Sequence, residues 1–200
     1  MKRFMGLFVV ALLVAFPAVA SAQSIGLSGT AGYYIPMGDD FEFVENSLGF
    51  DARLFATFTG GLELGVGVAR ISTEVGDEGV SVDYPSWQLY VEPRFNLNMP
   101  LMPIKPFIGA RAGWIQQSSE VLGHETKASG FTFGGIAGGN ITLAPSLALE
   151  LSVLFEHQSF GNIEIDGEEE PDSEATGQMI GLRAGLRFTI PRAVSVVTGL

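Results

Sequence analysis

The chain of 200 residues contains no cysteine, which excludes a disulfide framework and a thiolate metal site. Basic residues are few, because 11 Lys and Arg stand against 22 Asp and Glu, a net charge of −11. Nucleic-acid binding needs a basic footprint, so no nucleic-acid partner is expected. Only 16% of the residues are charged, whereas 46% are hydrophobic and 26 are glycine. This composition is unusual for a soluble domain.

Long apolar runs are also missing after the first residues, and none reaches the ~18 residues that a spanning helix needs. The chain begins with the basic residues Lys2 and Arg3, an apolar run from Phe4 to Phe16, and small residues ending at Ala22. This order predicts a signal peptide, residues 1–22, cleaved after Ala22, rather than a buried helix. Without Lys2 and Arg3, nine basic residues face 22 acidic ones, a net charge of −13 for residues 23–200. That length suits one domain.

Eight segments of the remaining chain alternate apolar and polar residues, the pattern of strands with two unlike faces. The connections between them alternate long (36–47, 73–83, 117–129 and 159–176) and short (59–61, 98–105 and 144–146). We predict an all-β fold, an eight-stranded antiparallel up-and-down transmembrane β-barrel over 23–190, with a short periplasmic tail over 191–200. The long loops would lie on the extracellular side. The expected strands are 24–35, 48–58, 62–72, 84–97, 106–116, 130–143, 147–158 and 177–190.

The polar faces of these strands carry a balanced set of charges in which every base is arginine, the residue suited to desolvated pairing with carboxylates. A soluble, lipocalin-like barrel would turn these charges to water and its apolar face inward. A membrane barrel would turn them into its lumen. The balance of charge and the many glycines favour the second, and a barrel of this size has room for little besides side chains. We therefore expect a plugged lumen with a charge network of Asp51, Arg53, Glu63, Glu92, Arg94, Arg111, Glu150, Glu156, Arg183 and Arg187.

Aromatic residues on the apolar faces fall near strand ends, where girdles at the two membrane interfaces are expected. Near the long loops these are Tyr33, Trp87, Trp114, Phe131 and Phe155, and near the short turns Phe58, Phe95 and Phe188.

Three stretches carry a family resemblance: Val91-Glu92-Pro93-Arg94-Phe95, Lys105-Pro106-Phe107-Ile108-Gly109-Ala110 and Gly185-Leu186-Arg187-Phe188-Thr189-Ile190. On them the chain resembles the small eight-stranded outer-membrane barrels of the OmpA-barrel and OmpX type. The resemblance implies a place in the cell outer membrane, with lipid and lipopolysaccharide as partners. It also implies recognition by the barrel-assembly machinery, with Gly185, Phe188 and Ile190 as the signal.

The expected function is a structural or surface-interaction role, since a plugged barrel is not a pore and its variable part is the extracellular rim. That rim is acidic: Glu164, Asp166, Glu168, Glu169, Glu170, Asp172 and Glu174 all lie in the last connection. Carboxylates can bind divalent cations, but no spacing matches an EF-hand loop, and solvated loops explain the charge. No metal, no cofactor and no identified surface partner are predicted.

An enzymatic alternative rests on His157 and Ser159, a His-x-Ser pair that resembles that of the outer-membrane lipid A deacylases. Alternation turns both side chains outward, and Glu164 or Glu168 could orient the histidine, as a serine nucleophile requires. The asparagine usual after that serine is replaced by Phe160. The simpler interpretation is a polar pair at a strand end, so we expect no enzyme activity.

Overall fold

The computed structural model describes residues 22–38, 41, 44–77, 80–97, 99, 102–121, 124–165, 168–169 and 175–191. Nearly all of them lie in strands. Within the described residues, no helix has the length and apolar character to cross a membrane. The strands are β1 (Ser24–Met37), β2 (Ser47–Thr57), β3 (Leu62–Asp77), β4 (Val80–Asn96), β5 (Ile104–Val121), β6 (His124–Ala144), β7 (Leu147–Ile165), β8 (Glu168–Glu169) and β9 (Ala175–Pro191).

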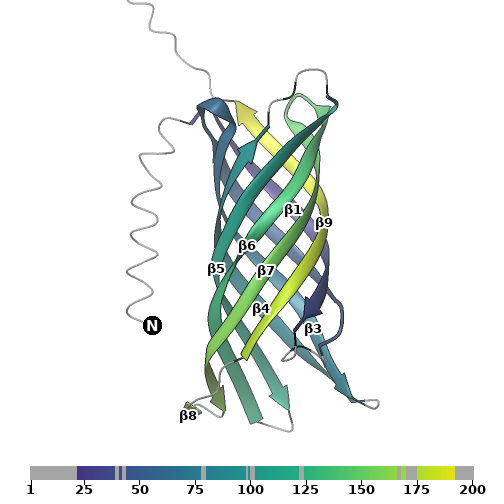
Figure 1. The fold of residues 1–200 in the computed structure, drawn as a ribbon, viewed down its shortest axis with the longest axis vertical. Coiled ribbons are helices and arrows are strands. Elements are labelled where there is room, and N and C mark those ends of the chain that lie inside the picture. The colour runs from purple at the N-terminus through teal and green to yellow at the C-terminus, as the bar shows by residue number, and fades with distance from the viewer. Residues whose placement is uncertain are drawn as a thin grey trace, which may run out of the picture.

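Eight of these strands close into an antiparallel barrel (Figure 1). The sheet order is β6-β5-β4-β3-β2-β1-β9-β7, and the pairing of β6 with β7 joins the two edges. The two-residue β8 pairs only with the far end of β7 and is not a barrel strand. The predicted eight-stranded up-and-down barrel is therefore confirmed.

The strands are staggered as well as closed. A row of paired residues followed once around the barrel leaves β1 at Ser24 and returns to it at Tyr34, ten residues farther along; the row is Ser24, Thr57, Glu63, Arg94, Gly109, Ile136, Leu154, Gly181 and Tyr34. Eight strands with this tilt enclose an interior that side chains can fill.

The strands extend farther than predicted on the side of the long connections. Most of 73–83 belongs to β3 and β4, and most of 117–129 to β5 and β6. β7 likewise continues to Ile165, where the sequence predicts a loop from 159. These loop predictions were wrong because they ended each strand where the apolar alternation ends. The ladder of backbone hydrogen bonds needs no apolar face and continues beyond it.

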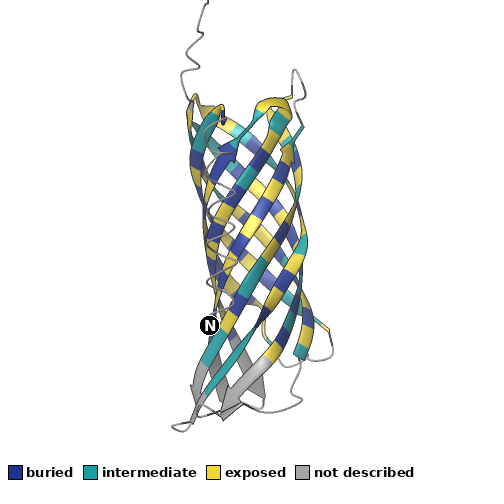
Figure 2. Ribbon diagram, turned by 90° about the vertical axis from the view of Figure 1, so that its left-hand side faces the viewer, coloured by how far each residue is buried: buried dark blue, intermediate teal, exposed yellow. Residues whose placement is uncertain are grey.

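Burial alternates along each barrel strand, as Figure 2 shows. Along β2 the side chains alternate buried and exposed from Ser47 to Phe55. The buried ones include Ser47, Asp51 and Arg53 (1% exposed), whereas the exposed ones are all apolar, such as Phe50 (67% exposed). This is the reverse of a lipocalin-like barrel, so that alternative is wrong.

Two glycine requirements shape this scaffold. Gly60 and Gly61, in the Thr59–Gly61 turn between β2 and β3, have φ values of 81° and 90°, which disfavour any other residue. In the interior, a Cβ on Gly67 would overlap the hydroxyl end of Tyr90. Gly67 therefore leaves the space into which the Tyr90 ring fits.

Candidate functional site

The ten charged residues predicted to share the polar face are all buried inside the barrel. They come from six different strands, β2, β3, β4, β5, β7 and β9. Nine of them join one continuous network of ion pairs, which has two halves.

One half of the network surrounds Arg53 and Arg94. Arg53 contacts Glu63 at 2.8 Å and Glu92 at 3.1 Å. Arg94 donates both Nη1 and Nη2 to Glu150, each at 2.8 Å, and its Nε contacts Glu92 at 2.5 Å. All five side chains are fully buried, with 0% exposure. The fork of a guanidinium on a carboxylate is the strongest form of such a pair.

The other half surrounds Asp51 and lies nearer the long connections, because Asp51 precedes Arg53 on β2. Arg111 contacts Glu92 at 2.6 Å and Asp51 at 3.0 Å, and Arg183 contacts Asp51 at 3.3 Å. The Tyr90 hydroxyl donates to Asp51 at 2.6 Å. Glu92 is therefore the link between the two halves, because it contacts Arg53, Arg94 and Arg111 together.

Glu156, the tenth predicted residue, is held in a different way. It is 3% exposed and accepts a hydrogen bond from the Gln88 amide at 2.6 Å. The same amide nitrogen lies 2.5 Å from the Thr132 hydroxyl. The hydrogen-bond partner of this buried carboxylate is therefore the Gln88 amide, which also lies beside the Thr132 hydroxyl. The balance of charges in the sequence suggests an arginine as its partner instead.

Aromatic rings inside the lumen are the part of the site that sequence reasoning missed. The guanidinium carbon of Arg111 lies 3.6 Å from the Tyr90 ring centroid, and that of Arg94 lies 4.3 Å from the Phe107 centroid. Phe55 receives two cations, Arg187 at 3.8 Å and Arg53 at 5.0 Å. Arg187 also forms an ion pair with Glu63. The alternation along the strands could have revealed these rings, because each is two residues from a residue of the polar face and therefore points to the same side.

The predicted girdle residues all lie on the outer surface. Trp87 is 53% exposed and Phe131 is 56% exposed, and Trp114 and Phe58 are partly covered. The other members, Tyr33, Phe155, Phe95 and Phe188, are exposed.

The residues of the predicted assembly signal lie on β9 beside β1. Phe188 and Ile190 face outward, opposite Leu27 and Ile25, and Gly185 lies opposite Thr30.

The predicted deacylase residues lie on the outer surface of β7, as the alternation requires. His157 packs against Phe133, with ring centroids 4.9 Å apart, and Ser159 pairs with Phe131 in the sheet. Among the hydrogen bonds between described residues, none joins His157 to Ser159. The side chains of Glu164 and Glu168 lie outside the described residues, as do most of the acidic loop residues. Within the described ranges, no group of three acidic or histidine side chains could hold a metal ion.

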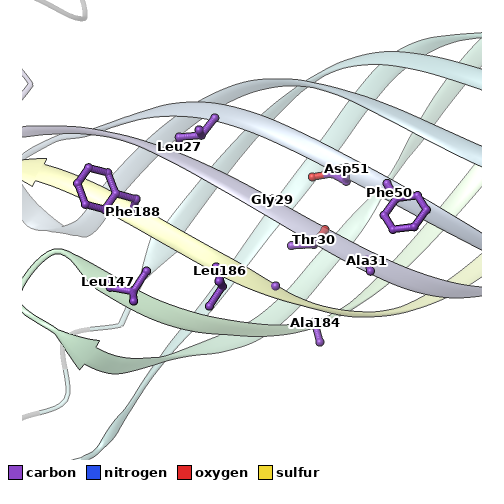
Figure 3. A pocket seen from close by; sticks show the side chains of 11 residues that line it. Leu27, Gly29, Thr30, Ala31, Phe50, Asp51, Leu147, Ala184, Leu186 and Phe188 are labelled. Carbon is purple, nitrogen blue, oxygen red and sulfur yellow. The ribbon is translucent and has the colours of Figure 1, made fainter.

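The outer surface is not uniform, because it is hollowed over β1 and β9 (Figure 3). The hollow has a volume of about 620 Å³. Its floor is made of small residues around Gly29, and its walls are large apolar side chains. The lining residues are Leu27, Gly29, Thr30, Ala31, Phe50, Asp51, Leu147, Ala184, Gly185, Leu186 and Phe188.

A closed barrel with charges inside and an apolar exterior is the architecture of a transmembrane β-barrel. Residues 8–188 match the family model described as outer membrane protein beta-barrel domain, and the chain belongs to this family. The protein is therefore an outer-membrane protein. No curated protein matches the sequence.

Solved structures show the same fold. Neisserial surface protein A is 16% identical with a TM-score of 0.61, over 82% of this chain and 96% of that one. A major outer membrane protein of Thermus thermophilus is 13% identical with a TM-score of 0.51, over 83% of this chain and 99% of that one. At these identities the likeness concerns the fold alone.

Proposed function

We propose that this protein is a non-conducting outer-membrane barrel whose lumen is plugged by its own side chains and whose role is structural or surface-interacting. The observation that carries the proposal is the Arg94–Glu150 pair, a two-pronged contact from β4 to β7 across the interior with no solvent exposure at either side chain. A continuous water path has to displace such pairs, and separating buried charges is costly.

Conductance measurements test the plug. The refolded protein, inserted in planar bilayers at known density, should give no discrete single-channel openings at moderate voltage. A matched variant, Arg94→Ala/Glu150→Ala, removes both members of the pair and leaves a gap between β4 and β7. Steady unitary openings of the unchanged protein would refute the plugged lumen. Openings confined to the variant would support the assignment of these residues as the plug.

The surface-interaction part of the proposal rests on the acidic loops and on the absence of a conducting role for a plugged barrel. The extracellular rim is the part of a membrane barrel that other molecules reach. Outer-membrane lipid, lipopolysaccharide and the barrel-assembly machinery are the proposed partners, the last through Gly185, Phe188 and Ile190 at the C-terminal strand. Changing Phe188 and Ile190 to serine should lower the amount of folded protein in the outer membrane, whereas unchanged amounts would exclude that signal.

A lipid A deacylase remains the alternative function, favoured by the outward position of His157 and Ser159 on one face of β7. Mass spectra of lipid A from cells with and without the protein distinguish the two. We expect an identical acyl pattern, and loss of one acyl chain that depends on Ser159 would establish the enzyme instead.

A further inference from the structure

Arg70 is an exception to the separation of charge and apolar surface. It lies on β3 and is exposed, facing outward in line with Val66 and Val68. Its neighbours across the two adjoining strands are Phe50 on β2 and Trp87 on β4. Among the described strand residues that face outward from one aromatic band to the other, the bands included, Arg70 alone is charged. A charge turned toward lipid is costly unless something at the membrane interface pairs with it.

The depth of Arg70 is fixed by its partner. Trp87 belongs to the aromatic band on the side of the long connections, and Arg70 is paired directly with it on the neighbouring strand, so the two side chains lie near the same level. In an outer-membrane barrel this is the extracellular side, where lipid headgroups begin. The guanidinium carbon lies 5.4 Å from the Trp87 ring centroid. Stacking on a ring uses the face of the guanidinium and leaves its in-plane N–H donors free for an oxyanion.

An apolar space suited to an acyl chain continues from this point. Phe50, the neighbour of Arg70, is also a wall of the hollow over β1 and β9 (Figure 3). Val68, two residues before Arg70 on β3, pairs with Ala52 on β2, and Ala52 pairs with Gly29 on β1. This row of side chains of decreasing size connects the surface next to Arg70 with the floor of the hollow. A Cβ on Gly29 would meet no atom closer than 3.9 Å, so the floor is open.

We propose that Arg70 and Trp87 form a headgroup site for lipid A, with a phosphate on the Arg70 guanidinium and one acyl chain in the hollow around Gly29. Charge complementarity selects an anionic group, since the site is a lone cation at headgroup level. The extracellular position selects the lipid of the outer leaflet. The inference deepens the lipid partnership proposed above and does not depend on whether the lumen conducts.

The test is native mass spectrometry of the full-length protein, folded in neutral detergent and mixed with purified lipid A. The unchanged protein should retain one lipid A molecule. Arg70→Gln should weaken retention about tenfold, the size expected for loss of a charge-assisted contact, and Arg70→Lys should weaken it less. Gly29→Leu should also weaken it by filling the floor of the hollow.

Matched controls separate this site from general adhesion. Gly135→Leu adds the same side chain at another outward glycine with open space, and Lys105→Gln removes an exposed base from the end of β5 on the side of the short connections. Both should bind as the unchanged protein does. The proposal is overturned if Arg70→Gln retains lipid A normally, or if phosphatidylglycerol binds Arg70 as tightly as lipid A does. A heat-modifiability gel on each variant shows that the barrel is folded, and this readout and conductance are independent of lipid retention.

Discussion

Glu92 is the side chain whose charge should matter most to stability. It is 0% exposed and contacts three guanidinium groups, those of Arg53, Arg94 and Arg111, at 3.1, 2.5 and 2.6 Å. Glu92→Gln keeps the shape and removes the charge. Three arginines then face one another with less anionic compensation in a site that water does not reach. Breaking a buried pair in this way costs about 3–5 kcal/mol, and we expect the free energy of unfolding to fall by that amount.

The assay is urea-induced unfolding of the protein refolded into vesicles, with the folded fraction measured by the gel shift between boiled and unboiled samples. Glu45→Gln is the matched control, because Glu45 is exposed in the loop before β2 and should leave the midpoint unchanged. A double variant, Glu92→Gln/Arg53→Met, removes one charge of each sign and should recover part of the loss. If Glu92→Gln unfolds within about 1 kcal/mol of the unchanged protein, the charge network does not hold the barrel together.

Three further predictions concern single features of the chain. Tyr90→Phe removes the hydroxyl that donates to Asp51 but keeps the ring beside Arg111; the same unfolding assay should show a loss of about 1.5–3 kcal/mol, and no loss would mean that the hydroxyl is not bonded. Gly67→Val places a branched side chain in the space of the Tyr90 ring, so the yield of heat-modifiable barrel should collapse, whereas Gly29→Val, at an open outward position, should still fold. Mass spectrometry of the protein isolated from outer membranes should give a chain that begins at Gln23, and a chain that retains residues 1–22 would disprove the predicted cleavage.

Alternation along the sequence located every barrel strand, because the two faces of a membrane barrel meet different media along the whole crossing. The same pattern failed beyond the crossing, where β5 and β6 continue as a hairpin after the apolar face has ended. It also gave no role to Phe55, Tyr90 and Phe107, which occupy inward positions and lie over the arginines.

The sequence by itself determined the architecture, the sidedness of each strand and the set of ten interior charges, because these depend on spacing along one chain. Tertiary structure decided which charges meet. Arg94 reaches Glu150 on a strand far along the chain, and Glu156 is bonded by Gln88 rather than by an arginine. Those pairings follow from the ten-residue stagger of the closed sheet, which sets the height of each strand against the next. Several staggers are compatible with the same alternation, so no single strand contains that information.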